Sequence, residues 1–277
     1  MNRESISLLQ LNIWQGVYID RIIDTVKKGS FDILHFQEVS GGNLSSGGGY
    51  NNPYHSVPMS SPVDSEKVGI DCFKALQEAL PEYNGILETC WTQTTDPSSY
   101  FGNATFIKKS LGIKEKKEIR HDDHQENLED KNAVKLEDLP RKSLAIKISV
   151  NNKDIWLINT HLAWGPTPED ADYKTKSAKY LANFVENLSE PFVLTGDFNV
   201  KPDTQLIEMF DKVGVNLVKK FEVKNTLNPR VHKAKQLFPP GIAVDYIFVH
   251  PDLAYSEFKR LDEDLSDHFG LSVKIEV

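Results

Sequence analysis

The stretch VLTGDFNV, residues 193–200, places an acidic and an amide side chain directly after a run of apolar residues. The branched residues at its start predict a buried strand, which we expect to cover Phe192–Thr195. Gly196 permits a tight exit from that strand. Asp197 and Asn199 follow two residues apart, at a place where an apolar segment should avoid a charge. The stretch therefore predicts a core strand whose end carries polar groups.

Short apolar runs with strand character recur along the chain, and only a few segments show helical spacing. Strand, helix and strand follow one another before residue 40, which predicts a βαβ-like opening. The pattern favours two sheets packed together with helices outside, although periodicity alone also allows a single open sheet. The other expected strands cover Ile6–Trp14, Phe31–Val39, Gly85–Trp91, Ala104–Lys108, Ser143–Val150, Ile155–Thr160, Ala243–Val249 and Leu271–Val277, and the expected helices cover Tyr18–Lys28, Lys67–Leu80, Glu169–Leu188 and Thr204–Val213.

Length and composition indicate one large α/β domain over residues 1–277. The chain carries 40 acidic and 32 basic side chains, so its net charge of −8 disfavours a protein that grips long duplex nucleic acid. Cys72 and Cys90 form no Cys-x-x-Cys pattern, which argues against a disulfide framework or a zinc cage. The sequence shows neither a signal peptide nor a transmembrane segment, and we expect a cytoplasmic protein.

Two segments attract attention without a clear chemical motif. Ser40–Pro53 is rich in glycine but lacks the spacing of a phosphate cradle, which favours a surface loop that starts two residues after Glu38. Lys114–Asp138 is dense in charge and contains His121-Asp122-Asp123-His124, a possible set of metal ligands. Nothing apolar in that segment would hold such ligands rigid, so we predict a solvated insertion.

Polar side chains stand at the ends of several expected strands. Each one alone is usually a turn former or a cap. Together they would need many separate explanations, whereas one shared site at the ends of packed strands accounts for all of them. The set comprises Asn12, Glu38, Asn159, His161, Asp197, Asn199, Asp245, Asp267 and His268.

The residue types in this set narrow the chemistry. The chain has no Gly-x-Ser-x-Gly and no His-Glu-x-x-His pattern, so an acyl-enzyme or a zinc protease finds little support. Oxygen-rich ligands suit Mg²⁺ or Mn²⁺. Asp197 paired with Asn199 can orient and deprotonate a water molecule. We expect His268, oriented by Asp245, and His161 to face the phosphoryl group on which negative charge develops.

Seven short motifs in order along the chain resemble the endonuclease/exonuclease/phosphatase superfamily, which has the deoxyribonuclease I-like fold. Each motif is weak alone, but the ordered set is specific and covers nearly the whole chain. The motifs are LNIW at 11–14, FQEV at 36–39, GNATF at 102–106, NTHL at 159–162, GDFN at 196–199, DYIF at 245–248 and SDHFGL at 266–271.

The resemblance implies a four-layer α/β sandwich of two packed mixed sheets flanked by helices, and metal-dependent hydrolysis of a phosphoester. Glu38 resembles the main metal ligand, with Asn12 and Asp267 close to the Mg²⁺ or Mn²⁺ ion. Asp197 and Asn199 resemble the pair that activates and places the water. His268 and Asp245 resemble the pair that stabilises the transition state, and His161 resembles a second phosphate-facing histidine.

One motif departs from the family pattern. GNATF lacks the Ser-Arg that often follows it in other members, and the candidate substrate-binding residues are Asn103 and Arg141. The superfamily acts on many phosphoesters, and its fold alone does not choose among them.

The sequence leaves several substrates open. FQEV and SDHFGL are similar to the tyrosyl-DNA phosphodiesterase branch, whereas LNIW with NTHL is also similar to neutral sphingomyelinases. We therefore expect a phosphodiesterase or phosphomonoesterase, acting at nucleic-acid ends or, alternatively, on sphingomyelin-like or inositol phosphates. A basic stretch at Asn228–Lys235 favours nucleic acid if it forms an edge of the site, and a solvated loop explains it equally well. Trp14, Trp91 and Trp164 are candidates to stack on bases, although tryptophan is more often part of the core.

A binding protein that kept this fold without its chemistry is a further alternative. Such a protein should have lost at least one of the residues on which hydrolysis depends, and Glu38, Asp197, Asp267 and His268 are all present. The sequence therefore favours an enzyme.

Overall fold

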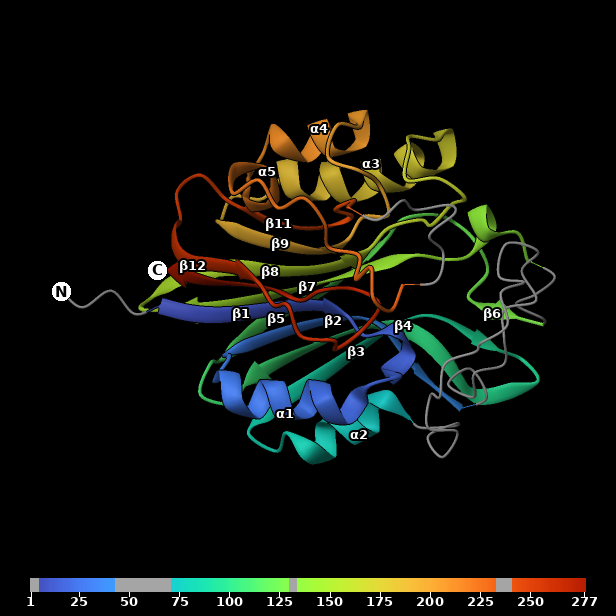
Figure 1. Cartoon of the computed structure of the whole chain (residues 1–277), viewed down its shortest axis with the longest axis horizontal. Helices are drawn as coiled ribbons and strands as arrows, with labels where there is room; N and C mark the ends of the chain where they lie inside the picture. The colour runs from blue at the N-terminus through green and yellow to red at the C-terminus, as the bar shows by residue number, and fades with distance from the viewer. Residues whose placement is uncertain (1–4, 43–70, 130–133, 233–240) are drawn as a thin grey trace.

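The computed structural model describes residues 5–42, 71–129, 134–232 and 241–277. Two mixed β-sheets lie face to face, and helices cover both outer faces (Figure 1). The helices are α1 (Ile19–Gly29), α2 (Cys72–Ala79), α3 (Asp172–Glu186), α4 (Gln205–Asp211) and α5 (Leu217–Lys220), with 3-10 turns η1 (Trp14–Gly16) and η4 (Leu136–Asp138). Helices α1 and α2 cover one sheet, and α3, α4 and α5 cover the other. This is the four-layer sandwich that the sequence predicts.

The first sheet contains seven strands and the second contains six. The strands of the first sheet are β1 (Ser5–Asn12), β2 (Ile33–Gly41), β3 (Tyr83–Gln93), β4 (Asp96–Lys108), β6 (Asn127–Leu128), β12 (Ala254–Arg260) and β13 (Leu271–Glu276), in the order β12-β13-β1-β2-β4-β3-β6. Those of the second are β5 (Ile113–Arg120), β7 (Lys142–Val150), β8 (Lys153–His161), β9 (Phe192–Asp197), β10 (Val215–Asn216) and β11 (Asp245–Val249), in the order β10-β11-β9-β8-β7-β5.

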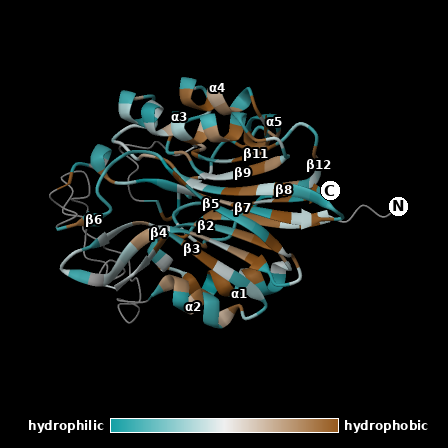
Figure 2. Cartoon of the chain, turned by 180° about the vertical axis from the view of Figure 1, so that it is seen from behind, coloured by the Kyte–Doolittle hydropathy of each residue, from teal (hydrophilic) through white to brown (hydrophobic). Residues whose placement is uncertain are grey.

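Strand β1 shows how the sequence specifies a strand buried on both faces. Leu9 and Leu11 pack in the cluster that contains α1 and α2, whereas Ile6 and Leu8 belong to the cluster that reaches the second sheet. Side chains on a strand alternate between faces, so both faces of β1 need apolar residues. β1 pairs in parallel with β2 and antiparallel with β13, which confirms the βαβ opening. Figure 2 shows the hydrophobic residues concentrated on the strands and on parts of the helices.

The charged segment Lys114–Asp138 differs from its prediction. Its first part is β5, an edge strand that pairs with β7 over residues 113–120, so it is no mere insertion. Six of its eight residues are charged, which keeps the open edge from pairing with other chains. This strand was not predicted because few of its residues face the core and its many charged residues are typical of a solvated loop. The short strands β6 and β10, strand β12 and helix α5 were also missed.

Several predictions fall partly outside the described residues. The expected helix at 67–80 begins at Cys72 in the structure, where Asp71 caps it by accepting a hydrogen bond from the Lys74 amide at 2.9 Å, and residues 67–70 lie outside the described part. The glycine-rich segment beyond Gly42 and the lysines of the basic stretch at 233–235 lie outside it as well. Across the described residues, no helix is long and apolar enough to cross a membrane.

Candidate active site

Three of the predicted residues stand in a row across the second sheet. His161 ends β8, Asp197 ends β9 and Asp245 begins β11. Asp197 is the register partner of His161 on one side and of Asp245 on the other. Neighbouring strands lie about 4.8 Å apart, so strand pairing alone brings these side chains together. All three are buried.

Gly196 makes that pairing possible. A Cβ at this position would lie 1.9 Å from the backbone oxygen of Thr160 on β8, which is closer than any side chain can approach. The glycine of VLTGDFNV is therefore needed for close strand contact immediately before Asp197.

The turn after Asp197 holds the side chain of that residue. Asn199 has a φ of 56°, in the left-handed region, and its backbone N–H donates to Asp197 Oδ1 at 2.9 Å. Its side-chain Nδ2 donates to the carbonyl of Leu162 at 3.0 Å, just beyond His161. The side chain of Asn199 therefore joins the ends of β8 and β9, and its backbone N–H holds one oxygen of Asp197 in place.

The first sheet supplies Glu38 and Asn12. The β2–β4 register shifts between Phe36 and Val39, and Glu38 has a φ of 57° within this irregularity. A bulge of this kind turns a side chain out of the regular ladder, and such strain is often found at functional sites. Glu38 is only partly buried, unlike the carboxylates of the second sheet.

Asn12 faces the carboxylates with its NH₂ group. Its Nδ2 donates to Glu38 Oε1 at 3.2 Å and to Asp197 Oδ2 at 3.0 Å, while its Oδ1 accepts the Trp14 amide at 3.0 Å. In this arrangement Asn12 holds two carboxylates near each other. Its oxygen, the atom that would coordinate a cation, is occupied by the backbone.

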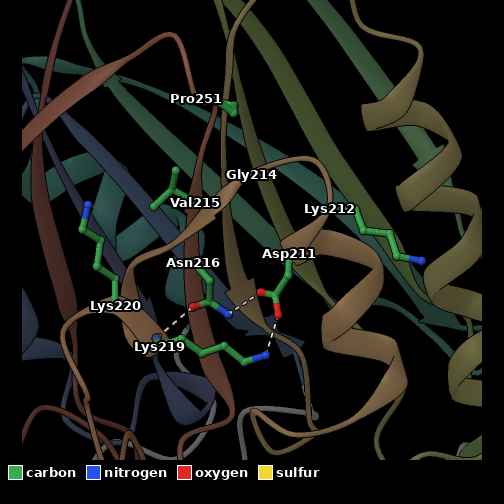
Figure 3. Close-up of a pocket in the computed structure, with 8 residues that line it drawn as sticks. All are labelled: Asp211, Lys212, Gly214, Val215, Asn216, Lys219, Lys220 and Pro251. Carbon is green, nitrogen blue, oxygen red and sulfur yellow. Dashed lines mark hydrogen bonds and ion pairs between the residues drawn. The ribbon is translucent and has the colours of Figure 1, made fainter.

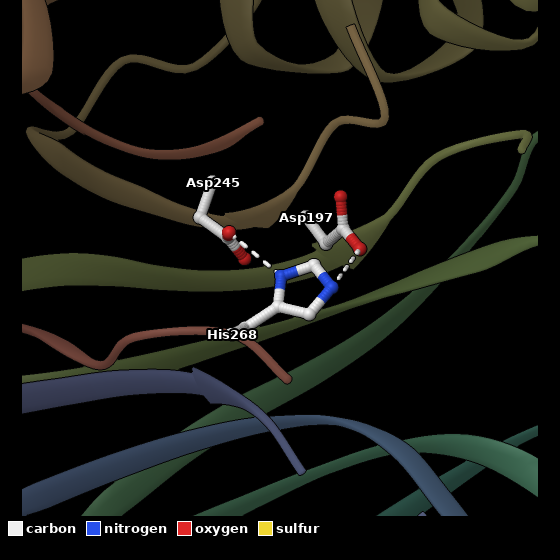
Figure 4. Close-up of side chains that lie close together, drawn as sticks. All are labelled: Asp197, Asp245 and His268. Carbon is white, nitrogen blue, oxygen red and sulfur yellow. Dashed lines mark hydrogen bonds and ion pairs between the residues drawn. The ribbon is translucent and has the colours of Figure 1, made fainter. Parts of the chain in front are cut away.

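His268 lies between Asp245 and Asp197 (Figure 4). Its Nδ1 is 2.8 Å from Asp245 Oδ2, and its Nε2 is 3.9 Å from Asp197 Oδ2. Burial lowers the pKa of His268, but the charge and hydrogen bond of Asp245 outweigh burial and raise it well above its usual range. Each of the three offers a ligand atom, and these atoms lie within 4.8 Å of one another, so the cluster could hold a metal ion.

The carboxylates of the site disfavour one another's ionisation. Burial, followed by the charge of Asp245, raises the pKa of Asp197 to about 6. Burial, followed by the charge of Asp267, raises the pKa of Glu38 to about 7. A nearby cation would favour the ionised forms, so both shifts indicate a site built around a positive charge.

Asp267 is held by a hydrogen bond to His232, a residue that was not among the predicted site residues. His232 Nδ1 is 3.2 Å from Asp267 Oδ2, and Ser266 Oγ donates to Oδ1 at 3.1 Å. Burial opposes ionisation of Asp267, but the hydrogen bond from His232 prevails and lowers its pKa. His232 was visible in the sequence only as one member of the basic stretch.

Arg141 is buried beside His161. Its Nη1 donates to His161 Nδ1 at 3.3 Å, its Nε is buried without a partner, and no carboxylate of the described residues lies within ion-pair distance of it. Burial, then the charge of Arg141, holds the pKa of His161 well below its usual range. His161 is therefore neutral, with its proton on Nε2, which lies 3.6 Å from Asp197 Oδ2.

Asn103 lies on β4 opposite the irregular part of β2. Its Nδ2 donates to the carbonyl of Lys142 at 2.9 Å, and its buried Oδ1 has no partner within the described residues. Hydrogen bonds and ion pairs therefore join eight of the eleven predicted residues: Asn12, Glu38, Arg141, His161, Asp197, Asn199, Asp245 and His268. Asp267 acts on Glu38 through its charge, and Asn159 bonds to the buried Gln37. Asn103 contacts the backbone next to Arg141 instead.

A set of buried amides supports the site, and sequence reasoning largely missed it. Gln10 Nε2 donates to Asp245 Oδ1 at 3.0 Å and to Gln37 Oε1 at 2.9 Å, and Gln37 Nε2 donates to Asn159 Oδ1 at 2.7 Å. All three residues are fully buried between the sheets. The period of two in β1 and β2 could have revealed them, since Gln10 and Gln37 share the inward face with Asn12 and His35.

The conspicuous surface hollow of the described chain lies elsewhere. It has a volume of about 510 Å³ and lies at the end of β11 opposite Asp245 (Figure 3). Its lining residues are Asp211, Lys212, Gly214, Val215, Asn216, Lys219, Lys220 and Pro251. Asn216 Nδ2 donates to Asp211 Oδ1 at 3.0 Å there, and Lys219 is paired with the same carboxylate. The hollow contains none of the predicted site residues, so geometry and charge locate the site better than surface shape.

Comparison with known proteins decides the family. Residues 9–268 match the endonuclease/exonuclease/phosphatase family. The chain belongs to this family. Its members are usually metal-dependent phosphoester hydrolases. A comparison with curated proteins gives no significant match.

Solved structures show the same fold at low sequence identity. An endonuclease/exonuclease/phosphatase from Bacteroides vulgatus is similar with a TM-score of 0.70 and 18% identity, covering 99% of this chain and 100% of that one. A mannosyl-6-phosphatase from Bacteroides thetaiotaomicron has a TM-score of 0.62 and 18% identity, covering 98% and 100%. D. rerio TDP2, complexed with single-strand DNA product, has a TM-score of 0.64 and 12% identity, covering 99% and 100%.

Proposed function

We propose that this protein hydrolyses a phosphoester, a phosphodiester or a phosphomonoester, with an activated water molecule and a divalent cation. The observation that carries the proposal is a buried carboxylate, Asp197, with cationic or hydrogen-bond-donating groups on two sides. His268 approaches its Oδ2 at 3.9 Å, and His161, backed by Arg141, approaches the same atom at 3.6 Å. A base surrounded by donors suits attack on an anionic phosphoryl group.

Glu38 and Asp267 are the residues we assign to the cation. The donor set fits Mg²⁺ or Mn²⁺, because it consists of carboxylate oxygens that are partly exposed and so leave room for bound water. The charge of Asp267 contributes to the raised pKa of Glu38, so the two carboxylates lie within electrostatic range of each other. We assign Asn12 to the support of Glu38, because its amide nitrogen and not its oxygen faces that carboxylate. When bound, the ion polarises a phosphoryl oxygen and stabilises the leaving oxyanion.

We assign the cluster of Asp197, Asp245 and His268 to proton transfer and charge stabilisation in preference to a metal. The Nδ1 atom of His268 is held by Asp245, and its raised pKa favours an imidazolium, which has no lone pair for a cation. Asp197, with a pKa of about 6, is ionised at neutral pH and basic enough to accept a proton from water. The N–H of Asn199 holds Oδ1 of Asp197, and we assign proton transfer to Oδ2, which accepts from Asn12 and faces the two histidines.

The phosphate is bound by the donors around Asp197. Arg141 is a buried guanidinium with unused N–H groups and no carboxylate partner among the described residues, which is costly unless an anion arrives. Neutral His161 donates from Nε2 only, and protonated His268 donates from Nε2 as well. We assign these three groups to the non-bridging oxygens, where negative charge builds up during hydrolysis.

The substrate belongs to one of two groups suggested by the structural neighbours. TDP2 was solved with single-strand DNA product, and the phosphatase from B. thetaiotaomicron acts on mannosyl-6-phosphate, as its name states. Arg230, the one arginine or lysine of the basic stretch in the described chain, is paired with Asp264 at 2.6 Å. Because Asp264 neutralises the charge of Arg230, this stretch gives less support for nucleic-acid binding. Small phosphoesters and nucleic-acid ends are therefore both tested.

A substrate panel tests the proposal. Single-stranded and duplex DNA, 5′-tyrosyl DNA, RNA, sphingomyelin, inositol phosphates, a sugar 6-phosphate and an aryl phosphodiester are each incubated with Mg²⁺ or Mn²⁺. We expect at least one to be hydrolysed, with loss of activity in EDTA and recovery when the metal is restored. Failure of every phosphoester with both metals, by protein whose circular dichroism shows a folded state, would favour the non-catalytic alternative.

A further inference from the structure

Lys174 is a buried cation, and among the described residues its hydrogen-bond partners are two backbone carbonyls. It lies in the first turn of α3 and is 1% exposed. Its Nζ donates to the carbonyl of Thr167 at 2.6 Å and to that of Asn199 at 3.0 Å. No ion pair joins it to a carboxylate of the described chain. Burial lowers its pKa to about 8, which reflects the cost of placing an ammonium there.

The two carbonyls belong to the two segments that carry the site. Thr167 lies in the connection from His161 to α3, and Asn199 follows Asp197 by two residues. The stem of Lys174 also shapes the connection, since a Cβ on Gly165 would lie 2.9 Å from Lys174 Cε. Lys174 therefore links the β8–α3 connection to the turn after β9 from the first turn of α3.

Within the part of the chain that the structure describes, Lys174 supplies the one side-chain donor to the Asn199 carbonyl. The backbone N–H of Asn199 is used on Asp197 Oδ1 and the Nδ2 atom on the Leu162 carbonyl. With φ at 56°, the residue occupies a region that is costly for an amino acid with a side chain. A donor on its carbonyl opposes relaxation of the turn. An apolar side chain of the same length would fill this space without the cost of a buried charge, but it could not supply that donor.

We infer that Lys174 is a positioning residue for hydrolysis, which fixes the Asn199 carbonyl so that the Asn199 N–H keeps Asp197 in the orientation that accepts a proton. This inference rests on the proposed function. It assigns no contact between Lys174 and the substrate. Small displacements of a catalytic group can reduce turnover by about 10²-fold, so loss of this support should be visible in kcat.

Lys174→Met and Lys174→Arg test the inference, with Ser177→Ala as the matched control. Ser177 is buried on the same helix, and its Oγ is buried without a partner in the described residues. We expect kcat of Lys174→Met to fall by about 30-fold with KM and Mn²⁺ affinity within about twofold of wild type. Lys174→Arg should recover part of that loss, because it restores a donor, and Ser177→Ala should match wild type.

Hydrogen exchange gives a readout that does not depend on activity. We expect the peptide that covers residues 196–201 to exchange faster in Lys174→Met, while a peptide within residues 178–186 of α3 exchanges as in wild type. If the wild-type protein hydrolyses nothing but this exchange pattern appears, the proposed function fails and the positioning contact stands. Wild-type kcat in Lys174→Met, or uniform faster exchange along α3, would overturn the inference.

Discussion

The space between the two sheets has an apolar half and a polar half, although the same strands and the same strand faces build both. On the inward face of β1, Ile6 and Leu8 are followed by Gln10 and Asn12. On the inward face of β2, Ile33 is followed by His35 and Gln37. The change falls at about the middle of each strand, and the polar half ends at the cluster of Asp197, Asp245 and His268.

The comparison separates what stabilises the fold from what performs chemistry. In the apolar half, burial of each side chain contributes stability, whereas in the polar half each buried group needs a partner to avoid a penalty. The polar partners come from the other sheet, as when Gln10 reaches Asp245 and Asn12 reaches Asp197. We expect substitutions in the apolar half to change the free energy of unfolding and substitutions in the polar half to change turnover. Four experiments test this division.

Asp197→Asn should have the largest effect. We expect kcat to fall by about 10³-fold, because the amide cannot accept the proton from water. The fold should be retained or become more stable at pH 8. The native state raises the pKa of Asp197 to about 6, so ionisation at pH 8 disfavours the folded protein, and a neutral side chain avoids that cost.

Steady-state kinetics and urea unfolding measure the two quantities. Asp154→Asn is the matched control, since Asp154 lies near the start of β8, far from His161 at its end, and should leave kcat unchanged. Wild-type turnover in Asp197→Asn would show that another group is the base.

Leu8→Ala should give the opposite result. Leu8 is fully buried in the apolar half, so its truncation should lower the free energy of unfolding by about 2–5 kcal/mol through lost burial and a cavity. The kcat of the molecules that remain folded should match wild type within about twofold, and Mn²⁺ affinity should be unchanged. Urea unfolding and kinetics at a temperature well below the transition measure both effects. A large fall in kcat without a change in stability would contradict the division.

The sequence was sufficient to single out the inward-facing carboxylates and histidines, because each stands at one end of an apolar run, where a charged or polar side chain is unexpected. Its periodicity predicted the buried strands β1, β2 and β9, but it left a single open sheet possible, and the four layers followed from the family resemblance. It was insufficient for β12, whose residues are mostly exposed or partly buried and which carries a register shift between Ser256 and Lys259 that interrupts the alternation. Edge strands lack the burial that makes a period of two visible.

The orientation of side chains also escaped the sequence. Asn12 was expected close to the cation, but which end of its amide would face the carboxylates depends on the Trp14 N–H, which takes the oxygen. Likewise, nothing in the sequence joins Lys174 to Asn199 or His232 to Asp267, because these contacts arise between segments that are 25 and 35 residues apart. Residue types predicted the composition of the site, and tertiary contacts determined its geometry.

Metal binding should weaken at low pH. Glu38 has a pKa of about 7, so below that pH a proton competes with the cation for its carboxylate. We expect the apparent Kd for Mn²⁺ to rise by about tenfold for each pH unit between pH 7 and pH 5, and to level off above pH 7. Calorimetry in two buffers of different ionisation enthalpy measures the affinity and the protons released.

Glu38→Gln provides the control for this pH dependence. The introduced amide does not titrate. We therefore expect this variant to bind Mn²⁺ more weakly and to show little change in Kd with pH, apart from the part that arises from Asp197. If the slope persists unchanged in Glu38→Gln, the cation is held by the cluster of Asp197, Asp245 and His268, and our assignment of the ligands is wrong.

Gln10→Leu should have the smallest effect, because it extends the apolar half by one position without removing a charged group. The substitution deprives Asp245 Oδ1 and Gln37 Oε1 of a shared donor, so we expect the free energy of unfolding to fall by about 1–2 kcal/mol. Asp245 keeps its bond to His268, and kcat should therefore fall by only a few-fold. Urea unfolding and steady-state kinetics measure the two effects. A gain in stability with unchanged kcat would show that Gln10 is not needed to hold Asp245. The boundary between the apolar and polar halves could then move toward the site.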